Sequence, residues 1–320
     1  MAEGNRKTRQ RVLAFCPNPT IDIWSEAEAV RPIHKIRTAN EIYDPGGGGI
    51  NVARVVRELG GEVEVLALAG GVTGMLLGEL LTERGVTHRI VPIAGRTRVS
   101  FTVHERASDL EYRFVAPGPD VTEAELAPVI EAIRDSDAGY VVASGSLPPG
   151  APRDLFIRVG EAVAARGARF VLDSSGDGLQ ETLRNGYVYL LKPSIGELST
   201  LAGRRLDETS ARDVALELVR GGRAGIVAVS MGASGALLVT PDRIIRSHAP
   251  AVHARSTVGA GDSFLGAMVT GLAAGQPLEE AFALGCAAGA AAVLQPGTRL
   301  CRRVDVERFR MSLPPMTILA

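Results

Sequence analysis

Residues 256–263 read Ser-Thr-Val-Gly-Ala-Gly-Asp-Ser and stand directly before the apolar segment FLGAMVTGLAAG. The apolar segment is typical of a helix, so the glycine-rich turn falls at a helix N-terminus. Gly259 and Gly261 lack a Cβ atom, which lets the backbone approach a ligand closely. Unpaired N–H groups and the helix dipole bind anions at such a terminus. We therefore expect the amides of Gly259, Ala260 and Gly261 to form an anion site.

Asp262 places a carboxylate inside this turn. A carboxylate would repel a phosphate, so it is unusual in a site that only holds phosphate. It suits a general base that takes a proton from an attacking hydroxyl group. The alternative is structural, with Asp262 as an N-cap in a tight turn. The sequence by itself leaves both roles open.

A second glycine-rich turn, Pro45–Gly49, precedes the helical segment INVARVVRELGG. Its backbone amides at Gly47 and Gly48, together with the Asn51 side chain, could hold sugar hydroxyl groups. The alternative is a flexible connection between a strand and a helix. The turn is not GxGxxG, and the chain has no GxxxxGK[ST], so the sequence favours neither a dinucleotide-binding dehydrogenase nor a P-loop enzyme.

Two further polar turns follow predicted strands, Lys192–Glu197 and Ser230–Gly235. Lys192 and Glu197 could hold nucleotide phosphate and the shell of its Mg²⁺, or they could form a surface ion pair. In open parallel sheets, ligands gather at the carboxyl ends of the strands. The glycine-rich and polar turns therefore predict one shared cleft.

Strands and helices alternate along most of the chain, and the strands are nearly continuous apolar runs. This pattern predicts an α/β fold, a mostly parallel sheet with helices on both faces. Residues 21–43 and 98–115 are extended and polar, so we assign them to a small β subdomain. We expect a flexible N-terminus over 1–10, one domain over 11–312 and a C-terminal tail over 313–320.

The composition places limits on function. Apolar residues make up 46% of the 320 residues, charged residues 22%, and the net charge is −1, which fits a globular protein with no bulk attraction for nucleic acid. The longest run of small apolar residues, AFALGCAAGAAAVL, is shorter than the ~18 residues that cross a bilayer, and it suits an internal helix. The 3 cysteines show no CxxC spacing, which predicts reduced thiols and a cytoplasmic protein.

Together the motifs resemble those of the ribokinase-like (PfkB) family of carbohydrate kinases. TVGAGDS is similar to the C-terminal signature of the family, and PGGGGINVAR with LGG is similar to the N-terminal one. The similarity runs from about Cys16 to Arg308. YRFVAPGP, SGSLPPG, VLDSSG and GTRLC look like the minor 6-phosphofructokinase branch, whereas 1-phosphofructokinases and tagatose-6-phosphate kinases usually carry GGKGxN where this chain has Gly46–Asn51.

The resemblance implies a ribokinase-like fold with a β-sheet lid that pairs into a homodimer. It also implies phosphorylation of fructose 6-phosphate by MgATP, with Asp262 as the base. The residues implied to bind the sugar phosphate are Asp22, Gly47, Gly48, Asn51 and Ser146, with Lys35, Arg37 and Arg98 on its phosphate. Those implied for MgATP are Lys192, Ser194, Glu197 (to Mg²⁺ through water), Ser230, Gly232, Gly235 and Thr257. A K⁺ site is implied near Ser256, Val258, Ala292, Gly297 and Arg299.

Lys35, Arg37 and Arg98 carry the argument for a phosphorylated substrate, because Arg forks match phosphate oxygens and a neutral sugar needs no such cluster. Alternatively they are solvated charges on strands. The family usually has KPNxxE where this chain has Ser194, and we expect weaker or water-mediated phosphate contact there. The competing activities are those of a 1-phosphofructokinase, a tagatose-6-phosphate kinase, or a non-catalytic nucleotide or sugar sensor on the same fold.

Overall fold

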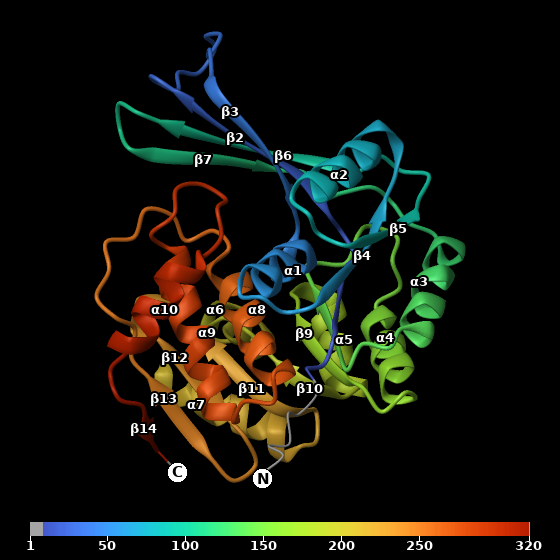
Figure 1. The fold of residues 1–320 in the computed structure, drawn as a ribbon, viewed down its shortest axis with the longest axis vertical. Helices are drawn as coiled ribbons and strands as arrows, with labels where there is room; N and C mark the ends of the chain where they lie inside the picture. Colours follow the sequence, from blue (N-terminus) through green and yellow to red (C-terminus); the bar gives the residue numbers. More distant parts are fainter. Residues whose placement is uncertain (1–8, 320) are drawn as a thin grey trace, which may run out of the picture.

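The larger sheet of the computed structural model, which describes residues 9–319, has ten strands in the order β14-β13-β12-β11-β10-β9-β8-β1-β4-β5 (Figure 1). Pairing is parallel from β11 through to β5 and antiparallel among β11, β12, β13 and β14. This confirms the mostly parallel sheet. The strands are β1 (Val12–Cys16), β4 (Val63–Ala69), β5 (His88–Pro92), β8 (Tyr140–Ser144), β9 (Arg169–Asp173), β10 (Val188–Leu191), β11 (Ala224–Ser230), β12 (Ala236–Val239), β13 (Ile244–Ser247) and β14 (Thr317–Ile318).

Helices cover both faces of this sheet because alternate residues of a strand point to opposite sides. In β1, Leu13 and Phe15 share one core with helices that cover the first face, whereas Val12 shares another core with helices on the second face. The first face carries α3 (Glu123–Asp135), α4 (Leu155–Ala164), α5 (Gly176–Asn185), α6 (Ile195–Leu201) and α7 (Glu208–Arg220). The second carries α1 (Gly48–Glu58), α2 (Gly71–Glu83), α8 (Ala260–Ala273), α9 (Leu278–Ala292) and α10 (Arg303–Ser312). We call this sheet with its helices the main domain.

Small residues let α1, α8 and α9 pack closely. A Cβ atom at Gly266 of α8 would lie 2.8 Å from Val55 Cβ of α1, and one at Gly271 would lie 2.9 Å from Ala281 Cα of α9. The alanine-rich run expected as an internal helix is α9. Among the helices that the structure describes, none combines the length and the apolar character that a bilayer-spanning segment requires.

A separate four-stranded sheet, the small sheet, stands over one end of the main domain (Figure 1). Its order is β3-β2-β6-β7, made of β3 (Ala39–Gly46), β2 (Thr20–Ala27), β6 (Arg98–Glu105) and β7 (Leu110–Val115). Its strands occupy the two segments that were expected to form a small β subdomain. Residues 28–38, beyond the outer end of β2, form no strand.

Three segments differ from the expectations or extend them. Residues 71–92, which the sequence pattern left unassigned, form α2 and β5 at one edge of the large sheet. In the expected tail 313–320, Thr317–Ile318 pairs with β13, a contact too short for periodicity to predict. Of the expected flexible N-terminus, residues 1–8 lie outside the described residues, and the Gln10 N–H donates to the Ala273 carbonyl.

Candidate active site

The first turns of α1 and α8, which follow the two glycine-rich turns, are joined by a hydrogen bond. Gly259, with φ of 72°, is the N-cap of α8, and Asp262 lies in the first turn of that helix. Asn51 of α1 donates from Nδ2 to Asp262 Oδ2 over 2.8 Å. Asp262 is therefore not the N-cap, which was the structural alternative for this residue. Its carboxylate is instead held by a side chain from the other glycine-rich turn.

Burial raises the pKa of Asp262 above its ordinary value, while the hydrogen bond from Asn51 and the charge of Lys192 work in the opposite direction. The side chain is only partly exposed. A carboxylate with a raised pKa is a stronger base than one free in water. The direction of the shift, a raised pKa, makes this carboxylate more basic than one in water.

Lys192 reaches the anion turn from the end of β10. A Cβ atom at Gly261 would lie 3.3 Å from Lys192 Nζ, so the ammonium group faces this turn. The side chain is only 4% exposed, and Nζ forms an ion pair with Asp173 Oδ1 over 3.2 Å. Lys192 is thus a buried cation beside the Gly259–Gly261 turn, and not part of a surface ion pair.

Asp173, at the end of β9, forms the ion pair with Lys192 and was not among the predicted site residues. Burial raises its pKa to about 7, against the charge of Lys192, which lowers it. Burial alone would lower the pKa of Lys192, but the carboxylates of Asp173 and Glu197 raise it above the ordinary value. A lone Asp after an apolar strand carries no local signal of function. Its position next to Lys192 follows from the adjacency of β9 and β10.

Ser194, the departure from the family pattern, caps α6. Its Oγ accepts from the Glu197 N–H over 3.1 Å, and its own N–H donates to Glu197 Oε2 over 2.7 Å. This reciprocal capping box satisfies two helix-end donors. The serine hydroxyl therefore has a structural task. The charge of Glu197 still acts on its neighbours, since it raises the pKa of both Asp173 and Asp262.

The Gly46–Gly49 turn is tightly packed, which excludes the alternative of a flexible connection. Gly47 is the N-cap of α1 with φ of 105°. A Cβ atom at Gly49 would lie 2.5 Å from the Phe15 carbonyl oxygen, and one at Gly48 would overlap with the Ser144 hydroxyl. Only glycine fits here, and the turn holds the start of α1 against the ends of β1 and β8.

Asp22 lies in β2 beside Asp44 of β3, its partner in the strand register. Burial raises its pKa to about 6, while the charges of Arg113, Arg54 and Arg98 lower it. Arg113, in β7, was not among the predicted site residues, although it lies in the quoted segment YRFVAPGP. Its effect on Asp22 places a positive charge beside the predicted sugar site.

The predicted basic cluster does not assemble within one chain. Arg98 donates to the carbonyls of Asn18 and Ala116, each over 2.8 Å. Lys35 and Arg37 are exposed and lie in the 28–38 segment, beyond the outer end of β2. Because Arg98 pairs with Thr20 at the inner end of that strand, the rise of a strand puts about 20 Å between Arg98 and the start of this stretch. In the described part of the chain neither Lys35 nor Arg37 forms an ion pair.

The structure gives a position or a backbone conformation for each of the remaining predicted residues. Ser146 is within 3.5 Å of Asn18 Nδ2. Ser230 pairs with Ser194, which joins the turns after β10 and β11. Gly232 and Gly235 adopt φ of 57° and 104°. Thr257 is exposed just before the anion turn.

The residues implied for K⁺ lie on two adjacent segments. The Val293 carbonyl, next to Ala292, accepts the N–H groups of both Arg255 and Ser256. A Cβ atom at Gly259 would lie 2.6 Å from Leu300 Cδ2, so the segment that contains Val258 lies beside the one that contains Arg299. Within residues 9–319, no group of three or more His, Cys, Asp or Glu side chains could hold a metal. Carbonyl and hydroxyl oxygens, which alkali cations accept, are the donors that this region offers.

Comparison with known proteins places the chain in a family of carbohydrate kinases. A family model described as pfkB family carbohydrate kinase matches residues 19–304. The ATP-dependent 6-phosphofructokinase isozyme 2 of Mycobacterium tuberculosis is 45% identical over 304 residues, covering 94% of this chain and 89% of that protein. The crystal structure of phosphofructokinase-2 from Escherichia coli in complex with potassium matches with a TM-score of 0.91 and 39% identity, covering 95% of this chain and 99% of that one. Its complex with fructose-6-phosphate gives a TM-score of 0.87 at 38% identity, with the same coverage of both chains.

Proposed function

Because the chain belongs to the PfkB family of carbohydrate kinases, we propose that it is an ATP-dependent 6-phosphofructokinase, which converts fructose 6-phosphate to fructose 1,6-bisphosphate. The observation that carries the proposal is the Asn51–Asp262 hydrogen bond, which joins both glycine-rich turns at one carboxylate. Lys192 faces the same turn from the other side.

In the proposed mechanism Asp262 accepts the proton of the sugar hydroxyl as that oxygen attacks phosphorus. Positioned general bases contribute about 10²–10⁴ in rate. The amides of Gly259, Ala260 and Gly261 hold the negative charge that develops on the transferred group, at roughly 10²–10³ per donor. Lys192, whose side chain is buried, adds a fixed positive charge.

Mg²⁺, when bound with ATP, neutralises phosphate oxygens. The donor set fits such an ion, because Mg²⁺ in kinases is held by phosphates and water with only one or two carboxylates. Asp173 and Glu197, both next to Lys192, would supply these carboxylates, with Glu197 acting through water. Ser194, Ser230, Gly232, Gly235 and Thr257 would line the nucleotide side.

On the sugar side, Asp22, Asn51, Ser146 and the amides of Gly47 and Gly48 would hold hydroxyl groups. For the existing phosphate we propose Arg113 together with Arg98. Two N–H groups of Arg98 already donate to backbone carbonyls, so we expect it to contribute mainly its positive charge. In the described residues Arg113 has no ion pair, so its fork is available to phosphate.

The experiment that tests the proposal is a panel of fructose 6-phosphate, fructose 1-phosphate, tagatose 6-phosphate and ribose, each with MgATP, followed by ADP release. We expect kcat/KM to be highest for fructose 6-phosphate. Preference for either of the other sugar phosphates would assign one of the rival kinase activities. No turnover of any substrate, with ATP still bound, would favour the non-catalytic sensor.

Three finer proposals follow. The small sheet would pair with a second copy, because Phe101 and Phe114, partners in the strand register, are 47% and 61% exposed. K⁺ would bind beside Val258 and Gly297 and raise activity over Na⁺. The protein would work in the cytoplasm, since Cys16, Cys286 and Cys301 are free thiols.

A further inference from the structure

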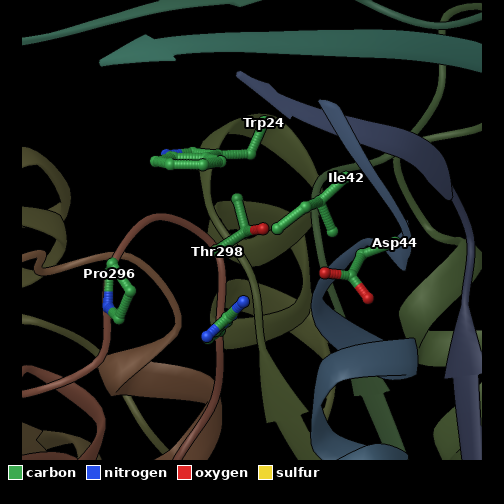
Figure 2. A pocket seen from close by; sticks show the side chains of 6 residues that line it. Trp24, Ile42, Asp44, Pro296 and Thr298 are labelled. Atoms are coloured by element: carbon green, nitrogen blue, oxygen red, sulfur yellow. The ribbon is translucent and has the colours of Figure 1, made fainter. Parts of the chain in front are cut away.

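The chain contains a single tryptophan, Trp24, and the structure places it where the small sheet meets the main domain. Trp24 follows Asp22 by two residues in β2, so both side chains point to the same face of the small sheet. Figure 2 shows Trp24 and Ile42 of the small sheet facing Pro296 and Thr298 of the main domain across a small hollow.

The closest approach in this region is between Trp24 and Gly297. A Cβ atom at Gly297 would lie 2.5 Å from Trp24 Cδ1 and 2.7 Å from Nε1. The φ of Gly297 is 61°, which also favours glycine. The bare backbone of the 296–299 turn therefore lies directly against the indole ring. Within the small sheet, the same ring stacks with His104 at a centroid distance of 6.3 Å.

Two effects of opposite sign act on the contact between Trp24 and Gly297. Burial of the aromatic ring favours the closed arrangement. The buried Trp24 Nε1, however, finds no acceptor in the part of the protein that the structure describes. An unpaired buried donor disfavours burial, and it would regain a partner in water if the small sheet moved away. The two effects therefore oppose each other at the same side chain.

We propose that Trp24 and Gly297 form a latch that seats the small sheet on the main domain and so positions Asp22 for the sugar. The position of Asp22 follows from that of Trp24 because β2 carries both. The kinetic part of this inference rests on the proposed kinase function. Trp24 acts through Asp22 and is a positioning residue.

The kinetic test compares Trp24→Ala with His104→Ala, which loses stacking within the small sheet but keeps the contact with Gly297. For Trp24→Ala we expect the KM of fructose 6-phosphate to rise about tenfold, equivalent to about 1.4 kcal/mol. The KM of ATP should change less than twofold, and Trp24→Phe should restore part of the loss. Equal KM values for the Trp24→Ala and His104→Ala variants would overturn the latch.

A fluorescence test needs no substrate, because Trp24 is the only tryptophan and all its emission reports this contact. Gly297→Ala should raise acrylamide quenching at least twofold and move the emission to longer wavelengths. The matched control is Gly203→Ala, whose φ is 65° with nothing within 4 Å of the added Cβ, and it should resemble wild type. Equal quenching in the two variants would refute the contact.

The kinetic and fluorescence tests distinguish failure of the latch from failure of the proposed kinase function. If fructose 6-phosphate is not turned over but quenching rises in Gly297→Ala, the latch stands and the proposed substrate is wrong. If Gly297→Ala does not fold, the test is acrylamide quenching of the wild-type protein with and without fructose 6-phosphate. Saturating fructose 6-phosphate should lower this quenching. Unchanged wild-type quenching in an enzyme that turns over this sugar phosphate would overturn the role of the latch.

Discussion

Replacing Asp262 with Asn tests the centre of the mechanism. The amide has nearly the same shape as the carboxylate, and its remaining oxygen can still accept from Asn51, as Oδ2 does now over 2.8 Å. Lys192 keeps Asp173 as its partner over 3.2 Å, so the cation should stay in place. The substitution therefore removes the proton acceptor and leaves the surrounding geometry intact.

The expected loss follows from the role of the base. A general base typically contributes about 10²–10⁴, and the loss of the charge beside Lys192 adds to this, so kcat should fall by about 10³–10⁴, or about 4–5.5 kcal/mol. A coupled assay of ADP release at saturating fructose 6-phosphate measures kcat, and titration calorimetry measures ATP binding, which should persist.

The matched control for Asp262→Asn is Asp305→Asn, which removes a carboxylate from the first turn of α10. It should cost stability through its ion pairs with Arg302 and Arg308 but leave kcat unchanged. If the Asp262→Asn variant retained kcat within tenfold of wild type, Asp262 would not be the base, and the kinase chemistry would need another group.

The other predictions concern the neighbouring charges. The folded-state pKa of Asp22 is about 6, above its ordinary 3.8, so this group stabilises the fold most at low pH and loses that contribution as pH rises through 6. Relative to Asp22→Asn, wild type should therefore lose about 2 kcal/mol of unfolding free energy between pH 4 and 7. Urea denaturation at each pH measures this, and an equal change of unfolding free energy in both proteins would contradict the prediction. Lys192→Met should lower kcat by about 10² or more and leave Asp173 buried without its partner; adding Asp173→Asn should recover the melting temperature but not kcat. Arg113→Ala should raise the KM of fructose 6-phosphate about tenfold or more without changing that of ATP, whereas Arg98→Ala should also lower the melting temperature. An equal rise in both KM values for Arg113→Ala would remove it from the phosphate site.

The sequence predicted the positions of the two glycine-rich turns at helix N-termini, which depend on local backbone geometry. A glycine-rich turn before an apolar helix, as at Gly47 and Gly259, can be predicted from a few adjacent residues. The mostly parallel sheet was predictable for a similar reason, since strands such as β1 and β8 are uninterrupted apolar runs between helices.

Residues whose role depends on tertiary neighbours were not predictable. Asp173 matters because β9 lies beside β10, and Arg113 because the register of the small sheet brings it near Asp22. Trp24 meets Gly297 across 273 positions of sequence, as their numbers show. For Lys35 and Arg37 the shared charge suggested one cluster with Arg98, and the length of β2 separates them from Arg98 within a single chain.

The capping box of α6 links the first turn of this helix to the charged groups around Lys192. The carboxylate of Glu197 holds the Ser194 amide and also lies among the groups beside Lys192. Drawing that carboxylate toward a divalent ion would release the amide and loosen the first turn of the helix. Binding of the nucleotide with its divalent ion should then speed deuterium uptake at residues 194–197.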